Sequence, residues 1–221
     1  MKQSTDTIIH DIRSAREYDD QARLTNWRGP EIIFGLSYEY VKPGQSLLDL
    51  GIGSGLSSIL FHKAGLQIYG LDGSSEILKV CAAKNFAVEL KLHDLRKLPL
   101  PYSTSSFDHV MAIAVLNSFS EPGSLFSDIA RILKGEGIFA FTVEEQKPDQ
   151  AASYPINRVE VSEKPDPESA VVLYRHSESY INGLLDRIHF NVLKTFEFVA
   201  YKYPAENIDI LFKAYITQKN R

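Results

Sequence analysis

Short apolar runs recur between residues 46 and 143, each followed by a stretch with a different period. The runs at 46–50, 66–71 and 107–115 are almost continuously apolar, which is typical of strands buried on both faces of a sheet. Between them, apolar residues recur every three or four positions, which predicts helices. These helices are expected at about residues 57–65, 74–84 and 123–134. Strands that alternate with helices predict a parallel sheet with helices on both faces.

Two further runs extend the predicted sheet. Residues 87–94 alternate between apolar and polar positions, and residues 138–143 form an apolar fifth strand. Gly135 and Gly137 are expected in the turn that leads into this fifth strand, because glycine commonly closes a helix. A sixth strand is expected at about residues 170–176.

The two ends of the chain follow other patterns. Residues 6–40 have helical periodicity, interrupted at Gly29 and Pro30. The segment from residue 144 to 176 is charged and rich in proline, and such long excursions are often lids. The last two strands are joined by "PAEN", a connection that forces an antiparallel pair. We expect one domain, residues 1–221, with a helical cap (1–40), a core (41–143), a lid (144–176) and a C-terminal helix with an antiparallel strand pair (177–221).

Charge and cysteine content narrow the range of functions. The net charge of -4 and the scattered lysines and arginines argue against nucleic acid as a partner. No run of about 18 apolar residues indicates a membrane span, and no signal peptide is evident. Cys81 is the single cysteine and lies at helical spacing among apolar residues, so we expect a buried thiol and no cysteine-based metal site. These features favour a cytoplasmic protein without a metal.

The stretch "LLDLGIGSG" joins a predicted strand to a predicted helix through Gly51, Gly53 and Gly55. A glycine-rich turn at a helix start exposes backbone N–H groups and lets a polar ligand approach the main chain. Dinucleotide-binding folds use G-x-G-x-x-G, whereas here Leu56 stands at the position of the third glycine. The spacing therefore favours another cofactor.

With Asp49 in front, this stretch resembles the first motif of the class I S-adenosylmethionine (SAM) dependent methyltransferases, in the small-molecule type 11/25-like group. The resemblance continues in order through "IYGLDGSSEIL", "KLHDLRKLPLPYSTSSFDHV", "FDHVMAIAVLNSF" and "ARILKGEGIFAFTV", and covers roughly residues 40–143. It implies an α/β fold: a three-layer α-β-α sandwich around a seven-stranded, mainly parallel sheet with one antiparallel strand. The cofactor implied is SAM, with S-adenosylhomocysteine as the product.

The resemblance also implies a set of cofactor-binding residues. An acidic residue at the end of the second strand, here Asp72, holds the ribose hydroxyls, and Asp94 lies near the adenine amino group. The leader "REYDDQA" is similar to one in which an aromatic residue closes over the methionine end. The full implied set is Tyr18, Asp49, Gly51, Gly53, Gly55, Asp72, Gly73, Asp94, Leu95 and Ala114.

Methyl transfer from a sulfonium is an in-line displacement that depends mainly on alignment. A general base is needed only if the acceptor must first lose a proton. His176 and Glu144 are the candidates for that base, and Tyr174, Arg175 and Asn117 are candidates for contacts with the acceptor. Among the other histidines, we expect His62 on the protein surface, His109 in the core, and His93 near the adenine of the cofactor.

The function predicted is methyl transfer from SAM to a small-molecule acceptor by a monomer or homodimer. Two alternatives stay open at this point: a non-catalytic protein that binds SAM as a regulator, and an NAD-dependent oxidoreductase. The identity of the acceptor and the attacking atom, whether oxygen, nitrogen, carbon or sulfur, are open as well.

Overall fold

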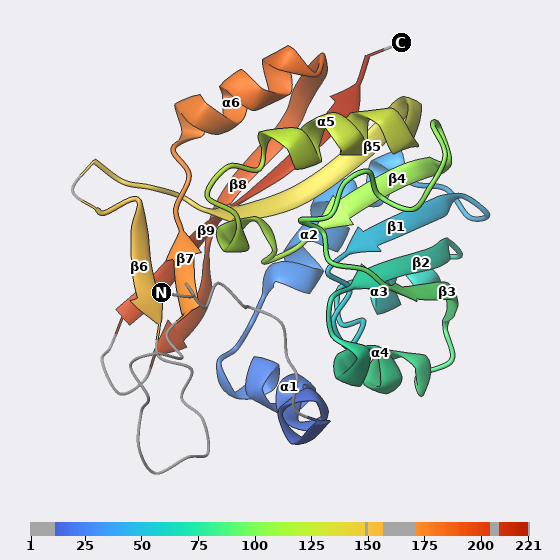
Figure 1. Ribbon diagram of the computed structural model, residues 1–221, viewed down its shortest axis with the longest axis horizontal. Coiled ribbons are helices and arrows are strands. Elements are labelled where there is room, and N and C mark those ends of the chain that lie inside the picture. The colour runs from blue at the N-terminus through green and yellow to red at the C-terminus, as the bar shows by residue number, and fades with distance from the viewer. Residues whose placement is uncertain (1–11, 149, 157–170, 204–207, 221) are drawn as a thin grey trace.

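A seven-stranded sheet forms the centre of the computed structural model, which describes residues 12–148, 150–156, 171–203 and 208–220 (Figure 1). The strand order is β3-β2-β1-β4-β5-β9-β8. Only β9 runs against its neighbours, since it pairs antiparallel with both β5 and β8 while the other pairs are parallel. The strands are β1 (Ser46–Leu50), β2 (Gln67–Asp72), β3 (Ala87–Leu92), β4 (Phe107–Ala112), β5 (Leu133–Glu144), β8 (Phe190–Tyr203) and β9 (Ile208–Lys219). The predicted fold class is thereby confirmed.

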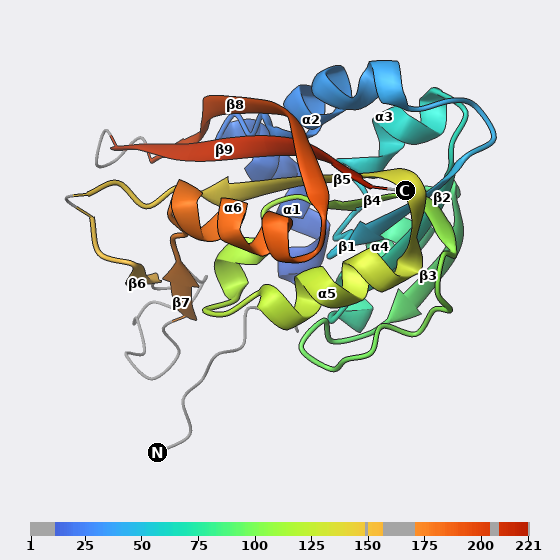
Figure 2. The same cartoon turned by 90° about the horizontal axis from the view of Figure 1, so that it is seen from above.

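Helices cover both faces of this sheet, so that the three layers are seen edge-on in Figure 2. One apolar cluster packs α5 and α6 against one face, and a second packs α2, α3 and α4 against the other. The helical segments are α1 (Ile12–Leu24), α2 (Gly29–Ser37), α3 (Ser58–Lys63), α4 (Ser75–Ala82), α5 (Gly123–Ile132) and α6 (Glu178–Arg187), with short 3-10 turns η1 (Tyr38–Tyr40) and η2 (Leu116–Ser118). The cap is split near Gly29 as expected, and α1 packs against α4.

Individual expectations about the core are met. Cys81 is buried on the face covered by α2, α3 and α4, as expected for a structural thiol. His109 is buried in β4, and its Nε2 lies 2.8 Å from the side-chain oxygen of Gln45, so it is a satisfied core residue. His62 is exposed on α3. Stacked rings such as those of Phe141 and Tyr215, with centroids 4.9 Å apart, pack on the face covered by α5 and α6.

The fifth strand begins earlier than the sequence predicts. We expected a turn at Gly135 and Gly137, but β5 begins at Leu133 and includes both residues. The pairing of β4 with β5 shifts register between Phe107 and His109, and a Cβ on Gly137 would lie 2.6 Å from the carbonyl oxygen of Asp108. Close approach of two strands, rather than a turn, therefore requires a glycine at position 137.

The lid segment contains a strand that its composition does not predict. β6 (Ser153–Ile156) pairs antiparallel with β7 (Val171–Tyr174) in a separate two-stranded sheet. Residues 157–170 of the lid and residues 1–11 of the cap lie outside the described residues. Within the part that the structure describes, no helix is long and apolar enough to cross a membrane.

Candidate active site

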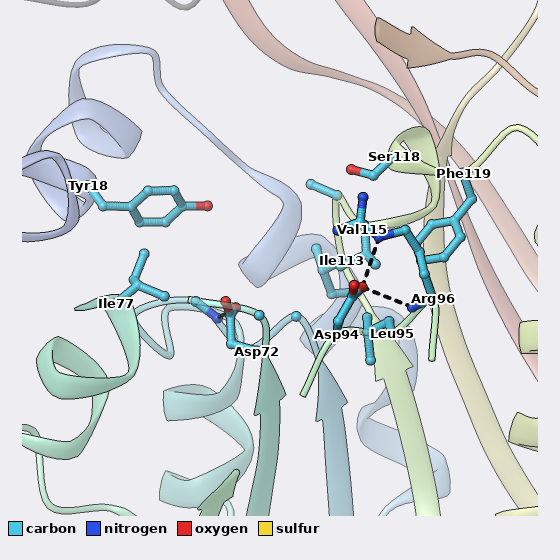
Figure 3. Close-up of a pocket in the computed structure, with 14 residues that line it drawn as sticks. Tyr18, Asp72, Ile77, Asp94, Leu95, Arg96, Ile113, Val115, Ser118 and Phe119 are labelled. Atoms are coloured by element: carbon cyan, nitrogen blue, oxygen red, sulfur yellow. Dashed lines mark hydrogen bonds and ion pairs between the residues drawn. The ribbon is translucent and has the colours of Figure 1, made fainter. Parts of the chain in front are cut away.

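The carboxyl ends of β1, β2 and β4 border a cavity of about 190 Å³ (Figure 3). The segments that reach it are α1, the turn after β1, the end of β2, α4, and the segments after β3 and β4. Its lining consists of Tyr18, Gly51, Gly53, Asp72, Gly73, Ile77, Asp94, Leu95, Arg96, Ile113, Ala114, Val115, Ser118 and Phe119. Ligands of open α/β sheets bind at this edge, where loops leave the carboxyl ends of the strands.

The glycine-rich turn forms the wall of the cavity next to β1. Gly51 and Gly53 have φ angles of +71° and +56°, a backbone region that residues other than glycine rarely adopt. A Cβ on Gly51 would lie 2.6 Å from the Val115 side chain. At Gly53, in contrast, the nearest atoms would be 3.9 Å away, on Ile77 and Tyr18, which both line the cavity. The missing side chain at position 53 therefore leaves space at the cavity itself.

Asp72 ends β2 and fixes the glycine-rich turn. Its carboxylate accepts hydrogen bonds from the backbone N–H groups of Gly53 and Ser74, both at 2.9 Å. Burial raises the pKa of Asp72, while the backbone N–H groups of Ser74, Gly53 and Gly73 act in the opposite direction. One carboxylate thus ties the two chain segments that face the cavity and still presents its oxygens to a ligand.

Asp94 lies beyond the end of β3 and is held by the residue two positions later. Its Oδ1 accepts bonds from the Arg96 backbone N–H at 3.1 Å and side-chain Nε at 2.8 Å. Although burial opposes it, this contact with Arg96 lowers the pKa of Asp94. Asp94 is therefore a carboxylate at neutral pH, and Oδ2 remains to receive an N–H group of a ligand.

Tyr18 reaches the cavity from the cap helix α1, with its hydroxyl directed inward (Figure 3). Tyr18 as a whole is 37% exposed, but removal of its hydroxyl from solvent, followed by the negative charges of Asp72, Asp19 and Asp49, raises the pKa of Tyr18 to about 12. The phenol therefore keeps its proton and can donate it in a hydrogen bond. Its neighbour Asp19 accepts hydrogen bonds from the Ser54 hydroxyl in the glycine-rich turn and, at 2.5 Å, from Lys84 Nζ after α4.

The segment from Ala114 to Phe119 forms the wall on the β4 side. Ala114 has a φ of +56°, an arrangement that costs a residue with a Cβ about 1–2 kcal/mol. The backbone N–H of Ala114 donates to Thr142 Oγ1 of β5 at 2.9 Å. Such strain clusters at ligand sites when the surroundings impose it.

Eight of the ten residues predicted to bind the cofactor line this cavity: Tyr18, Gly51, Gly53, Asp72, Gly73, Asp94, Leu95 and Ala114. Asp49 and Gly55 do not line it. Asp49 is buried in β1 and accepts a bond from the Ser58 hydroxyl at 2.7 Å, and burial raises its pKa to about 8, against the effect of that bond. A Cβ on Gly55 would lie 2.4 Å from the Phe86 ring, so Gly55 is required by packing.

The candidates for the acceptor side bond mainly to one another and to the backbone. Arg175 Nε donates to Glu144 Oε1 at 2.7 Å, and Glu144 is only 3% exposed. Buried His176 lies with Nε2 3.1 Å from the carbonyl oxygen of Leu116. None of these three, nor Tyr174 or Asn117, lines the cavity.

His93 does not line the cavity either. Its Nε2 lies 2.8 Å from the carbonyl oxygen of Lys97. Glu144 and His176 have side chains of the types used in catalysis, but their partners Arg175 and Leu116 lie 31 and 60 positions away in the sequence.

Several cavity residues are not in the predicted set: Ile77, Arg96, Ile113, Val115, Ser118 and Phe119. Most of them flank predicted residues, for example Arg96 after Leu95 and Val115 after Ala114. Their position next to a strand end is a signal that could have included them. Among the described residues, no group of three or more histidine, cysteine, aspartate or glutamate side chains is arranged to hold a metal ion.

A cavity at the carboxyl edge of this sheet, lined by a glycine-rich turn and by acidic residues at two strand ends, is typical of a nucleoside-type cofactor site on a Rossmann-like fold. Residues 48–141 match the family model described as a methyltransferase domain. This part of the chain, less than half of its length, is therefore similar to a methyltransferase domain.

Two proteins and one solved structure illustrate the likeness. An uncharacterized chloroplastic methyltransferase of Arabidopsis thaliana is 34% identical over 125 residues, which cover 52% of this chain and 35% of the relative. A demethylmenaquinone methyltransferase of Renibacterium salmoninarum is 33% identical over 95 residues, 43% of this chain and 39% of the relative. The chain thus spans less than half the length of these relatives.

The structure of a SAM-dependent methyltransferase from Methanosarcina mazei superimposes with a TM-score of 0.68 at 19% identity, and covers 84% of this chain and 97% of that one. At this identity the likeness concerns the fold.

Proposed function

We propose that the protein is an enzyme that transfers a methyl group from SAM to a small-molecule acceptor. The observation that carries the proposal is the pair of carboxylates, Asp72 and Asp94, which follow neighbouring strands and face one cavity with the glycine-rich turn. A vicinal diol matches two carboxylate oxygens, and an adenine amino group matches one.

In this proposal the predicted cofactor-binding residues contact different parts of SAM. Asp72 holds the ribose hydroxyls, and Asp94 accepts from the adenine amino group beside the backbone N–H of Leu95. Gly51, Gly53 and Ala114 face the methionine portion, which Tyr18 covers from α1.

The charge of the cavity favours SAM over a dinucleotide. Asp72 and Asp94 line it, and Arg96, the basic residue of the lining, is paired with Asp94, so the cavity attracts a sulfonium cation more than the pyrophosphate of NAD. Leu56 lines a separate cavity between α1, α2 and α3, and it occupies the position where a dinucleotide fingerprint needs glycine. Both observations argue against the oxidoreductase alternative.

The chemistry proposed relies on alignment. When bound, SAM supplies a methyl group already activated by the positive sulfur. The titratable side chains among the described cavity residues are Tyr18, Asp72, Asp94 and Arg96, and the first three have tasks toward the cofactor. Glu144 and His176 are engaged elsewhere, so a site that works by placing the two reactants supports the proposal better than one built around a base. The small-molecule acceptor is supported by the relative named for demethylmenaquinone.

Titration calorimetry of the purified protein with SAM, S-adenosylhomocysteine and NAD tests the cofactor. We expect micromolar binding of the first two and none of NAD. Incubation with methyl-labelled SAM and fractionated metabolite extracts then tests turnover, with transfer of label to a small molecule as the expected result. Binding without turnover on any fraction would instead identify a regulator, and binding of NAD alone would refute the cofactor assignment.

The cap helix provides a prediction with a matched control. Replacing Asp19 with alanine removes the contacts to Ser54 and Lys84 that tie α1 to the cofactor site, and we expect SAM affinity to fall about three- to ten-fold. Replacing the adjacent Asp20 removes only an exposed pair with Arg23 on the same helix, and affinity should not change. Calorimetry and stopped-flow dissociation of SAM measure both variants. Equal affinities would show that the tether does not affect binding.

A further inference from the structure

The cavity wall between residues 114 and 119 is held in an unfavourable conformation. Four of its residues, Ala114, Val115, Ser118 and Phe119, line the cavity. Ala114 adopts a φ of +56°, and the side-chain oxygen of Asn117 is buried without a hydrogen-bond partner. Both features are costly, and a segment that carries them keeps its shape only when neighbouring elements impose it.

Two side chains from outside the segment bond to its backbone. Thr142 of β5, fully buried, accepts a hydrogen bond from the backbone N–H of Ala114 at 2.9 Å. His176, 4% exposed, lies between β7 and α6, and its Nε2 donates to the carbonyl oxygen of Leu116 at 3.1 Å. These contacts lie on either side of Val115 and thus define the course of the wall.

His176 is itself fixed by the end of the sheet. Its backbone N–H donates to the carbonyl oxygen of Glu144 at 3.0 Å, and its carbonyl oxygen accepts from the N–H of Gln146 at 3.1 Å. Its ring is stacked on that of Tyr180 of α6, with ring centroids 5.7 Å apart. The backbone and the ring of His176 are therefore both held in place where the imidazole contacts η2.

We propose that His176 is a positioning residue: by hydrogen bonding to Leu116, and together with Thr142, it holds the 114–119 wall in the shape that SAM and the acceptor require. The activity measurements that follow from this inference rest on the proposed function. A base role does not fit the same geometry, because the ring lies outside the cavity lining and its Nε2 is occupied by a backbone carbonyl.

The test uses two pairs of variants. His176→Phe keeps an aromatic ring over Tyr180 but removes the N–H donor, whereas His176→Gln keeps an N–H donor near the position of Nε2. Thr142→Val removes the hydroxyl at nearly constant size, and Thr142→Ser keeps it. His62→Phe, on the exposed surface of α3, is the control for a histidine-to-phenylalanine change.

We expect His176→Phe and Thr142→Val to raise the Kd of SAM by about ten-fold or more and to lower kcat. Thr142→Val leaves the Ala114 N–H unpaired, and His176→Phe removes the bond from outside the segment, so that the Leu116 carbonyl keeps only the N–H of Phe119 within the wall itself. His176→Gln and Thr142→Ser should remain within about three-fold of the unchanged protein, as expected when one donor or acceptor replaces another. Melting temperatures measured in parallel identify effects that come from stability alone. If His176→Phe does not fold, the Thr142 pair decides.

Three results would overturn the inference. His176→Phe and Thr142→Val could bind SAM and turn over like the unchanged protein. The two His176 variants could be equally impaired, with loss of the acidic limb of the pH profile of kcat, which would indicate a base. Both Thr142 variants could behave alike. Failure of the unchanged protein to bind SAM would instead refute the proposed function, so the two are distinguished by the calorimetry of the unchanged chain.

Discussion

Replacing Asp72 with alanine is expected to weaken SAM binding by about 10²- to 10⁴-fold, since two charge-assisted hydrogen bonds of about 1.5–3 kcal/mol each would be lost. The variant also loses the bonds that hold Gly53 and Ser74 against the end of β2, so part of the effect comes from a loosened glycine-rich turn. Titration calorimetry with SAM and with S-adenosylhomocysteine measures the change, and circular dichroism verifies that the variant is folded.

Glu76→Ala is the matched control for this prediction. Glu76 lies four residues after Asp72, in the first turn of α4, where it pairs with Lys79 and does not line the cavity. The same charge is removed, yet SAM affinity should stay within about two-fold, as for other exposed helix pairs. Because burial raises the pKa of Asp72, acidification should weaken SAM binding by protonating this carboxyl at a higher pH than an ordinary aspartate. A folded Asp72→Ala protein with unchanged affinity would contradict the assignment to ribose.

The cofactor half of the site could be predicted from the sequence because its chemistry is local. Gly51, Gly53 and Asp72 each follow a strand that is recognisable from its apolar run, and parallel strands bring their carboxyl ends to the same edge of the sheet. The residue type and the distance from a strand end are then sufficient to place each group. The parallel sheet with helices on both faces follows from the same alternation of strands and helices, whereas the number of seven strands is what the family resemblance implies.

The acceptor half could not be predicted in this way because its contacts join distant segments. Arg175 and Glu144 are 31 positions apart and bond to each other, which the sequence gives no means of recognising. His176 and Leu116 are separated by 60 positions, and their contact turns a candidate base into a side chain bonded to the backbone. A charged residue after a strand end is thus compatible with catalysis and with internal pairing alike.

Asp49 shows a further limit of motif reasoning. It belongs to the stretch that resembles the first motif of the family, yet it is buried in β1, bonded to Ser58, and does not line the cavity. A sequence motif includes every residue that the local structure requires, and some of these residues stabilise the turn without lining the cavity. The three glycines divide in the same way, because Gly51 and Gly53 line the cavity and Gly55 does not.

The last prediction separates the two kinds of glycine by opposite effects. At Gly53, with a φ of +56°, an alanine methyl group meets nothing closer than 3.9 Å, so Gly53→Ala should cost only about 1–2 kcal/mol of folding free energy. That methyl group would, however, project between Tyr18 and Ile77 at the cavity, and we expect SAM affinity to fall about ten-fold or more. Denaturant unfolding and calorimetry give the two quantities.

Gly55→Ala should show the reverse, because the new Cβ would lie 2.4 Å from Phe86 and 3.1 Å from Cys81 in a residue whose φ is +89°. Overpacking and backbone strain together should cost about 2–5 kcal/mol of stability, while the fraction that remains folded binds SAM with nearly unchanged affinity. Equal loss of affinity in both variants would mean that the turn responds as one unit. Loss of stability without loss of affinity at Gly53 would remove the argument that its missing side chain makes room for the cofactor.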